Sequence, residues 1–511
     1  MSIVEEYYDE IPYTSNVFKE SLPENSYIAG LMHGINVTLP EKARVLEIGC
    51  AVGGNIIPFA LNHPKAKVVA IDISSSHIKK ADELKTALGL KNIKFIKKDI
   101  LEIDKSFGEF DYIIAHGIYS WVSEEIKDGI LKIFEECLSK NGIAYLSYNT
   151  YPGWKGKEIL RDIMLFRVGD DKKATQERLN LGFDTLSYLK NNAKDNIVRK
   201  VIDEHYNIIV NSSPSYILHE YFEPFNKPNY LYEVAGDAAK KGLNFICEAS
   251  WSSSLFPPVG KKLREALKAE CKGDRVRFEQ FIDFITNKTF RQTLFTKAEV
   301  KDEAELKIDM LDTFFISGKF SYDGVKKHYK NTLKSVFMPR EMGELWDKLN
   351  EIYPSSLNVG EFMKKYKTTH SEEEVQKFYA NLAYVLYAQM ASFSLYKSKS
   401  LKDKPEKPKL SKVSQNLLEF IKANPNLVSF FNSNYDFIYL NPDVDFELFA
   451  MFDGSKDISS LEKELVKIQE SGKFNFILED KVVINKYKIK KMAKTYIDEK
   501  VSLLFDLGYL V

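Results

Sequence analysis

The sequence contains few cysteines and no long hydrophobic run. Its four cysteines, among 511 residues, are widely separated and form no Cys-x-x-Cys pair, which argues against a disulfide framework or a zinc site built from cysteines alone. No apolar stretch approaches the roughly 18 residues needed to cross a bilayer. The acidic N-terminal stretch, interrupted by Pro12, is unlike a signal peptide. We therefore expect a cytoplasmic protein without a membrane span.

An excess of positive charge is also missing. Lys+Arg and Asp+Glu number 72 each, which gives a net charge of +0. Nucleic-acid-binding proteins usually have an excess of lysine and arginine, so we expect no nucleic-acid partner. The balanced net charge does not exclude a local basic patch. The eight histidines form no HxxxH or HExxH pattern, and we expect no metal site. Aromatic residues, in contrast, are plentiful, with 28 Tyr and 34 Phe.

The first 150 residues alternate between strand-like and helix-like segments. The short β-rich runs are 43–49, 67–72, 93–99, 110–117 and 142–149. Such alternation predicts an α/β fold with a doubly wound, Rossmann-like parallel sheet. Two later runs, after Gly242 and at 290–295, are expected to complete this sheet after a helical insertion at about 155–225. A separate domain beginning at 155 is the alternative.

The remaining chain predicts α-rich middle and C-terminal domains. We place the sheet domain at 1–298 and a helical middle domain at 299–396, which ends in a periodic helical stretch. A lysine- and proline-rich segment at 397–413 cannot bury a core and reads as a solvated linker. The C-terminal domain follows at 414–511, and within it residues 482–489 suggest a strand.

The segment VLEIGCAVGGN (residues 45–55) carries the chemistry. A strand-like run leads into Gly49, while Gly53 and Gly54 stand where the next helix should begin. Because glycine has no Cβ, a cofactor can approach this backbone closely. The dinucleotide fingerprint GxGxxG would need a third glycine where this chain has Ala51. An NAD(P)-dependent oxidoreductase is therefore only the alternative, and we find no motif for a nicotinamide pocket.

The same segment, with Glu47 two residues before Gly49, resembles motif I of class I S-adenosylmethionine-dependent methyltransferases, E/D-x-G-x-G-x-G. Ala51 departs from the middle glycine of that pattern. Asp72 ends the second strand 19 residues after Gly53 (72 − 53 = 19), close to the roughly 20 residues expected for an acidic residue that binds ribose hydroxyls. The resemblance implies S-adenosylmethionine as the cofactor, with Asp99 near the adenine amino group and the next residue against the ring.

Five longer phrases resemble a narrower family. They are YDEIPYTSNVF (8–18), FDYIIAHGIYSWV (110–122), SYNTYPGW (147–154), HEYFEPFNKP (219–228) and DFITNKTFRQTLF (283–295). They resemble the methyltransferases that carry the methyltransferase regulatory domain, a group that includes the rickettsial protein-lysine methyltransferases acting on outer membrane protein B. The resemblance covers about the first 300 residues and departs at 21–23, where the family tends to have Thr-His-Pro. It implies a protein substrate with lysine as acceptor, and an outer-membrane protein as a candidate target.

These patterns predict two sets of site residues. For the cofactor we expect Tyr13, Ser15, Glu47, Gly49, Cys50, Ala51, Gly53, Asn55, Asp72, Ile73, Asp99, Ile100 and His116. For catalysis we expect His116, Tyr119, Trp121, Asn149 and Tyr221. Each has an ordinary packing role as its alternative, and the lid that the resemblance implies for 13–15 has a plain N-terminal strap as its alternative. The triplet 219–221 is expected to shape the acceptor pocket by hydrogen bonding.

Methyl transfer needs the nucleophile, the methyl carbon and the sulfur to be held in line. A lysine amine, with a pKa of about 10.4, must first lose a proton, and a desolvated aromatic channel favours its neutral form. The size of the chain favours a protein substrate, and the late domains suggest either substrate recruitment or a homodimer. The alternatives are a small-molecule N- or O-methyltransferase and a non-catalytic cofactor-binding regulatory protein.

Overall fold

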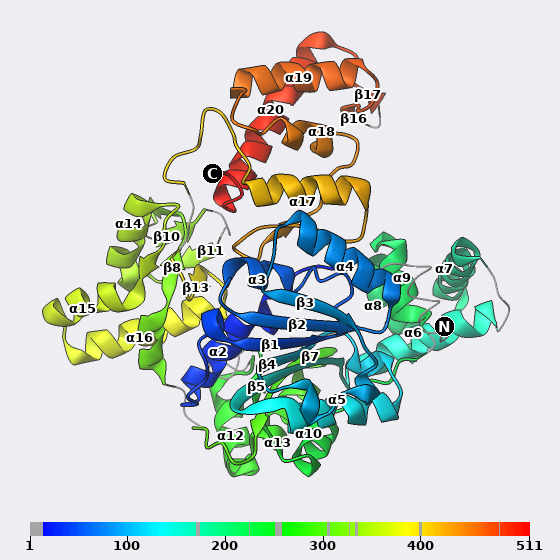
Figure 1. Cartoon of the computed structure of the whole chain (residues 1–511), viewed down its shortest axis with the longest axis vertical. Helices are drawn as coiled ribbons and strands as arrows, with labels where there is room; N and C mark the ends of the chain where they lie inside the picture. Colours follow the sequence, from blue (N-terminus) through cyan, green and yellow to red (C-terminus); the bar gives the residue numbers. More distant parts are fainter. Residues whose placement is uncertain are drawn as a thin grey trace.

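The computed structural model describes residues 14–169, 174–223, 225–250, 258–303, 307–326, 328–332, 336–397, 401–479 and 481–511. A seven-stranded sheet lies at the centre, in the order β3-β2-β1-β4-β5-β7-β6 (Figure 1). Its strands are β1 Arg44–Ile48, β2 Lys67–Asp72, β3 Ile93–Lys97, β4 Phe110–Ala115, β5 Leu138–Asn149, β6 Leu243–Glu248 and β7 Phe290–Lys297. This confirms the Rossmann-like α/β fold.

The sheet is mixed, whereas the sequence analysis predicted a parallel one. Strands β1 to β5 pair in parallel, but β7 lies antiparallel between β5 and β6. The two late strands therefore complete the sheet as predicted, with one of them reversed. The reversal of β7 brings its first residues, from Phe290 on, to the edge at which β5 ends, because Asn149 pairs with Phe290.

Helices cover both faces of this sheet. They are α2 Pro23–Met32, α3 Ile57–Asn62, α4 Ser75–Ala87, α5 Glu124–Cys137, α10 Leu231–Lys240, α12 Lys261–Cys271 and α13 Arg275–Thr286. The two faces have separate hydrophobic clusters, and successive residues of one strand alternate between them: Val45 belongs to one cluster and Leu46 to the other. Burial on both faces explains why β4 carries a continuous apolar run, residues 112–115.

The helical insertion consists of α6 Trp154–Val168, α7 Thr175–Asn192, α8 Ile197–Asn211 and α9 Pro214–Tyr221. These helices share a third hydrophobic cluster of their own, which includes Leu160, Leu179, Ile202 and Ile217. The insertion lies beside the sheet on the right of Figure 1. It therefore packs as a distinct unit although the sheet resumes after it.

The middle region is α-rich in its second half, as predicted, with α14 Gly343–Ile352, α15 Val359–Thr369 and α16 Glu372–Tyr387. Its first half contributes short strands that the sequence analysis did not predict: β8 Phe315–Ser317, β9 Phe320–Asp323, β10 His328–Asn331 and β11 Val336–Met338. Two more, β12 Leu357–Asn358 and β13 Ser392–Ser394, pair with β8. The predicted helix up to residue 396 ends at Tyr387, because Gln389 adopts a positive φ of 50° and β13 follows.

The C-terminal region contains α17 Lys412–Ala423, α18 Asp445–Ala450, α19 Ile458–Glu470 and α20 Lys486–Asp506, with the hairpins β14 Phe430–Phe431, β15 Phe437–Ile438 and β16 Ile477–Leu478, β17 Lys481–Val482. The strand predicted at 482–489 is wrong, because Asn485 caps α20 by accepting a hydrogen bond from the backbone of Lys488. The end of the predicted linker is also folded, since Leu410 is fully buried and its N–H bonds the Phe452 carbonyl at 2.8 Å.

One hydrophobic cluster continues from the sheet into the middle and C-terminal regions, so the domain boundaries drawn from the sequence stay a prediction.

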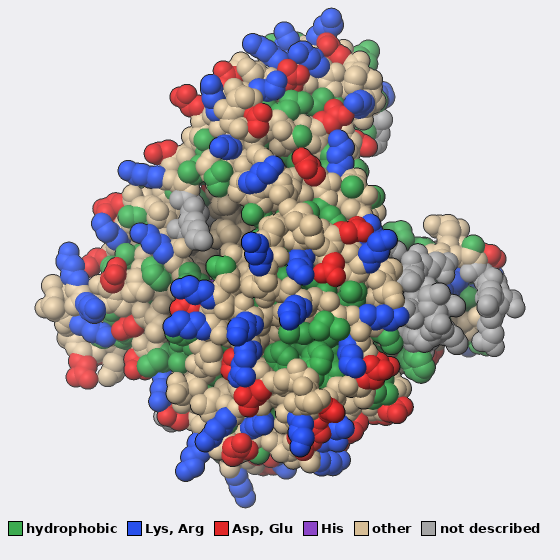
Figure 2. Space-filling view, viewed as in Figure 1, with side chains coloured by type: hydrophobic (Ala, Val, Ile, Leu, Met, Phe, Trp, Pro, Cys, Tyr) green, Lys and Arg blue, Asp and Glu red, His purple; other side chains and the backbone are tan. Residues whose placement is uncertain are grey.

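Basic and acidic side chains are interspersed over the face drawn in Figure 2. Among the described residues, no helix has both the length and the apolar character that a membrane span needs.

Candidate active site

A cavity of about 740 Å³ opens at the carboxyl ends of the central strands. One end is lined by the loops after β1, β2 and β3, and the other by residues of α6 and α9. Open α/β sheets bind their ligands at this edge. The cavity is therefore the candidate active site. We call the end at the loops after β1, β2 and β3 the cofactor end, and the end at α6 and α9 the acceptor end.

The turn after β1 has the backbone conformation that glycine favours. Gly49 has a φ of +67° and Gly53 a φ of +82°, both in the left-handed region. Ala51, the departure from the family pattern, is also left-handed, with a φ of +46°. Its N–H donates to Oδ2 of Asp72 at 2.9 Å, and this bond helps to hold the alanine in a conformation that L-residues rarely adopt.

Asp72 connects two cofactor-end loops at the end of β2. Besides the Ala51 amide it accepts the N–H of Ser74 on Oδ1 at 2.9 Å, and Nδ1 of His77 lies 3.5 Å from the same oxygen. The carboxylate lines the cavity and is held rigidly by backbone donors. A carboxylate fixed in this way can accept hydrogen bonds from a vicinal diol.

Glu47 is buried at the end of β1, and one of its oxygens lacks a partner. Oε1 accepts a 2.7 Å bond from the Asn55 amide, whereas Oε2 has no hydrogen-bond partner among the described residues. Burial, reinforced by the charge of Asp72, raises the pKa of Glu47 to about 8. An orphaned, buried oxygen at the cavity wall fits a ligand with a cationic or N–H group, and the approach of such a group favours the ionised form of Glu47.

The loop after β3 supplies a third contact region. Asp99 caps a short 3-10 helix (Ile100–Glu102) by accepting the N–H of Leu101 at 2.9 Å. Asp99, Ile100 and Ile73 all line the cavity. One carboxylate beside two aliphatic side chains suits a flat ring that carries an amino group.

An N-terminal strap, residues 14–19, crosses the cofactor end. Oγ of Ser15 accepts the N–H of Gly54 at 3.0 Å, and the N–H of Phe18 bonds Oδ1 of Asn55 at 2.8 Å. Gly54 is needed for this approach, because a Cβ there would lie 2.3 Å from the Ser15 carbonyl oxygen. The ring of Phe18 stacks on His116 at a centroid distance of 3.9 Å.

His116 follows β4 and is held by a hydrogen-bonded chain. Its Nδ1 lies 2.9 Å from the hydroxyl of Tyr145, which accepts the side-chain amide of Gln292 at 3.0 Å. The Tyr145 proton is then available to Nδ1. Burial lowers the pKa of His116 to about 4, so the ring is neutral near pH 7.

The acceptor end combines aromatic rings with charged groups. Trp121 and Trp154 meet edge to face at 6.2 Å. Nζ of Lys157 lies 2.7 Å from Oε1 of Glu220 and 5.0 Å from the centre of the Trp154 ring. The hydroxyl of Tyr216 also donates to this carboxylate, at 3.2 Å. The wall of the cavity therefore already holds one ammonium between a carboxylate and an aromatic ring.

A second polar group stands nearby. His219 and Glu223, one helical turn apart, are joined at 2.8 Å, and both line the cavity. Asn149, at the end of β5, also lines it, and its Nδ2 has no hydrogen-bond partner among the described residues. The amide is a donor available to a ligand.

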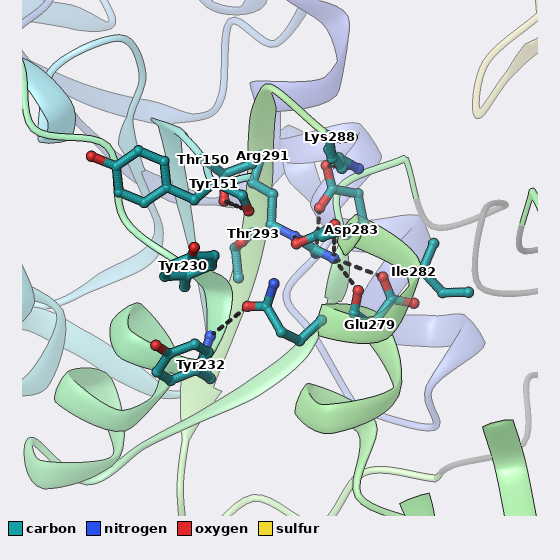
Figure 3. Close-up of polar contacts among 12 residues, drawn as sticks. Thr150, Tyr151, Tyr230, Tyr232, Glu279, Ile282, Asp283, Lys288, Arg291 and Thr293 are labelled. Atoms are coloured by element: carbon teal, nitrogen blue, oxygen red, sulfur yellow. Dashed lines mark hydrogen bonds and ion pairs between the residues drawn. The ribbon is translucent and has the colours of Figure 1, made fainter. Parts of the chain in front are cut away.

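Arg291 fixes β7 beside the cavity. Its fully buried side chain bonds Glu248 at 2.9 Å, Asp283 at 2.7 and 2.8 Å and Glu279 at 3.0 Å (Figure 3). Burial alone would lower the pKa of Arg291, but these carboxylates outweigh that effect and hold the pKa above its ordinary value. Its neighbours in β7, Phe290 and Gln292, line the cavity, since adjacent strand residues point to opposite faces.

Two family descriptions match this chain. "Methyltransferase domain" matches residues 39–164, and "Predicted methyltransferase regulatory domain" matches residues 213–297. The protein RP789 of Rickettsia prowazekii is 30% identical over 99% of this chain and 93% of its own length. The chain belongs to the S-adenosylmethionine-dependent methyltransferases that carry this regulatory domain.

Two further relatives extend the comparison for this methyltransferase. RP028 of Rickettsia prowazekii is 33% identical over 47% of this chain and 96% of its own length. The solved structure of PKMT2 from Rickettsia typhi in complex with AdoHcy matches with a TM-score of 0.80, 24% identity and coverage of 98% of this chain and 100% of that one. At this identity the likeness establishes the fold, including that of the middle and C-terminal regions.

The methyltransferase brings most of the predicted cofactor residues to one cavity. Those that line it are Ser15, Glu47, Gly49, Cys50, Ala51, Asn55, Asp72, Ile73, Asp99, Ile100 and His116. Gly53 lies beside it, against the ring of Phe95. Tyr13 lies outside the described residues. Their roles at the cofactor stay a prediction that this placement favours.

The predicted catalytic residues divide into two groups. His116, Trp121 and Asn149 line the cavity. Tyr119 is instead buried in the hydrophobic cluster beneath α5, and Tyr221 in the cluster of the helical insertion. Because both hydroxyl-bearing rings face packed interiors, their position does not support direct contact with an acceptor.

Several cavity residues were not among the predicted site residues. They include Asn16, Phe18, Lys157, Tyr216, Glu223, Phe225, Phe290 and Gln292. Of the triplet 219–221, which was expected to shape the acceptor pocket by hydrogen bonding, His219 and Glu220 line the cavity and form hydrogen bonds there. Its middle member, Glu220, faces the cavity, whereas the predicted Tyr221 faces away.

Proposed function

We propose that this protein transfers methyl groups from S-adenosylmethionine to lysine side-chain amines of a protein substrate. When bound, the cofactor supplies a methyl carbon activated by a positively charged sulfur. We infer that Asp72 holds the ribose hydroxyls, Asp99 the adenine amino group, and the free oxygen of Glu47 the cationic part of the cofactor, because all three line the cavity and that oxygen has no partner among the described residues. The AdoHcy complex of PKMT2 supports this choice of ligand.

The lysine acceptor is supported above all by the pair of Lys157 and Glu220. The ammonium of Lys157, which belongs to the chain itself, lies against the carboxylate of Glu220 and over the ring of Trp154. The hydroxyl of Tyr216 bonds the same carboxylate. Carboxylates and aromatic faces are the groups that bind an ammonium. We infer that an incoming lysine amine uses the same groups, with Lys157 moving aside or sharing Glu220.

The surroundings also favour deprotonation of that amine. Trp121, Trp154, Phe18 and Phe290 line the cavity, and we infer that their rings desolvate the amine between Glu220 and the cofactor end. The carboxylate of Glu220 favours the ammonium form, whereas desolvation beyond it lowers the pKa of the amine. The amine therefore reaches its neutral, nucleophilic form as it leaves the ion pair, with Glu220 as the acceptor of the proton. Since the neutral ring of His116 and the free amide donor of Asn149 both line the cavity, we infer that they orient this amine. Alignment of the amine with the methyl carbon is then the main source of rate enhancement.

The family resemblance extends the proposal to a cell-envelope protein as the substrate, with an outer-membrane protein as the first candidate. The two alternatives are a small-molecule N- or O-methyltransferase and a cofactor-binding protein without turnover. A homodimer stays a prediction.

The test is a labelling assay with radioactive S-adenosylmethionine and fractionated extract of the source organism. We expect label on lysine in envelope proteins, located by mass spectrometry. Label confined to the small-molecule fraction would favour the metabolite alternative. Tight binding without any label would favour the non-catalytic one. Glu220→Gln, with Glu204→Gln on the exposed face of α8 as the control, tests whether labelling depends on the acceptor end.

A further inference from the structure

The C-terminal region reaches the strap that covers the cofactor end of the cavity. The N–H of Ser15 donates to the carbonyl of Leu427 at 2.9 Å, and the N–H of Ser429 donates to the Ser15 carbonyl at 3.3 Å. The Thr14 hydroxyl donates to the carbonyl of Asn426 at 2.8 Å. The strap thus pairs in parallel with a segment more than 400 residues later in the chain.

Side chains extend this pairing along the strap. Lys19 forms an ion pair with Asp436 at 2.6 Å. The side-chain amide of Asn16 donates to the hydroxyl of Tyr439 at 3.4 Å. All of these partners belong to residues 426–439, which include β14 and β15 and are called here the β14–β15 segment.

The same strap residues contact the cofactor end directly. Ser15 bonds the backbone of Gly54 in the glycine-rich turn, and Phe18 bonds Asn55 and stacks on His116. Ser15, Asn16 and Phe18 line the cavity. One face of the strap therefore contacts the cavity while the other contacts the β14–β15 segment.

The β14–β15 segment is itself anchored on the sheet domain. The hydroxyl of Tyr435, in the turn of the hairpin, donates to the buried carboxylate of Glu24, which His63 also bonds at 2.6 Å. The side chain of Asn62 bonds the carbonyl of Ser433 at 2.7 Å. Since Asn62 and His63 lie at the end of α3, the segment is fixed to the helix that follows the glycine-rich turn.

We propose that the β14–β15 segment is a part of the cofactor site, because it holds the strap in the position that closes the cofactor end. Asp436 and Tyr439 are its positioning residues and do not touch the cofactor. The inference rests on the proposed function, since it takes the cavity to be the S-adenosylmethionine site. It assigns the C-terminal region a role in cofactor affinity.

Thermodynamic linkage makes the proposal reciprocal. If the pairing of strap and segment strengthens cofactor binding, bound cofactor must strengthen that pairing by the same factor. Amide hydrogen exchange reports this in the full-length wild-type protein. We expect S-adenosylhomocysteine to slow exchange at both Ser15 and Ser429, whose N–H groups form the pairing. Slower exchange in the strap alone, with 426–439 unchanged, would overturn the proposal.

Charge reversal tests the side-chain contact. Lys19→Asp and Asp436→Lys each place like charges together, and the double variant restores an opposite pair. We expect each single variant to raise the Kd of S-adenosylhomocysteine about threefold to fivefold, as befits a partly exposed ion pair. The double variant should return to within about twofold of wild type. Calorimetry gives the Kd, and the melting temperature of the free protein checks folding.

A matched control separates this contact from general effects of charge. Glu447→Lys breaks an ion pair with Lys473 of the same 2.6 Å length in the same region, and it should leave the Kd unchanged. Single variants with wild-type affinity, or a loss that the double variant does not recover, would overturn the inference. Failure of the wild-type protein to bind S-adenosylhomocysteine would overturn the proposed function as well, so the two failures are distinguishable.

Discussion

Lys157 and Glu220 face each other at 2.7 Å in the wall of the cavity, although 63 residues separate them in the chain. The first belongs to α6 and the second to α9, so the packing of the helical insertion creates the pair. Their side chains are only 17% and 14% exposed. A pair of this kind binds an ammonium in a setting with little competing water.

Glu220→Gln should therefore weaken acceptor binding selectively. A hydrogen bond to a charged group contributes about 1.5–3 kcal/mol, so we expect kcat/KM for a lysine-bearing substrate to fall at least about tenfold. The Kd of S-adenosylhomocysteine should stay within about twofold. Steady-state kinetics and calorimetry measure the two quantities. An equal loss of both would contradict a role limited to the acceptor.

Lys157→Met should act in the opposite direction. Removal of the internal ammonium leaves Glu220 free for the acceptor, and methionine keeps most of the apolar stem against Trp154. We expect a lower KM for the lysine substrate, by about threefold or more if the internal pair is worth about 0.7 kcal/mol. A raised KM would show that Lys157 supports the acceptor rather than competes with it.

Asp72→Ala should sharply weaken cofactor binding. The variant loses the carboxylate that we propose binds the ribose, and also the acceptor of the Ala51 N–H, which holds a left-handed alanine. We expect the Kd of S-adenosylmethionine to rise about 100-fold, equivalent to about 3 kcal/mol. Asp82→Ala, in the same loop-helix unit on α4, is the control. Unchanged affinity in Asp72→Ala would remove the basis of the site assignment.

Glu47 predicts a pH dependence of stability. In the folded, ligand-free protein its pKa is about 8, against 4.5 as its ordinary value. Between these values the folded state holds a proton that the unfolded state has lost, so the contribution of Glu47 to stability falls as pH rises from about 4.5 to about 8. Glu47→Gln keeps an acceptor for Asn55 and avoids this loss.

We expect Glu47→Gln to exceed wild type in free energy of unfolding by on the order of 4 kcal/mol at pH 8, and to match it near pH 4. Urea titrations at the two pH values measure this difference. Glu135→Gln, on the exposed face of α5, should show no such trend. A stability difference that is the same at both pH values would contradict the buried, protonated carboxyl.

Arg291→Met should destabilise the protein strongly. The substitution leaves Glu248, Asp283 and Glu279 without their buried cation, and breaking one partner of a buried ionic group costs about 3–5 kcal/mol. Because Phe290 and Gln292 depend on the position of β7, the remaining folded protein should also bind substrate less well. Thermal unfolding and kinetics together check this. A variant with wild-type stability would mean that the network contributes little.

The central sheet was predictable from the sequence because its signals are local. The inner parallel strands β1 and β4 are short, mostly apolar runs buried on both faces, and the glycine-rich turn at 49–54 marks the start of the cofactor loop. The cofactor end depends on strand ends that follow one another in the same sheet. It was therefore possible to predict that Asp72 and Asp99 lie at one edge of the sheet without knowing how distant segments pack.

The acceptor end was less predictable because its contacts join distant segments. Lys157 gave no signal of its own, and Tyr221 was preferred over Glu220 although the two are adjacent and face opposite ways. Strands of two to four residues, such as β8 and β13, are too short to show an alternating pattern. The approach of 426–439 to the strap depends on tertiary packing alone.

The pairing of Thr14 with Asn426 spans 412 residues, and this has a consequence for the order of events during synthesis. A ribosome that adds about 5–20 residues per second needs roughly 20–80 s to cover that span. The Rossmann-like sheet has all seven strands by Lys297, so it can form well before its strap has a partner. If the β14–β15 segment holds the strap as proposed, we expect each newly made molecule to pass through an interval with a folded sheet and an open cofactor pocket, and to acquire full affinity only when the segment around Asn426 has emerged.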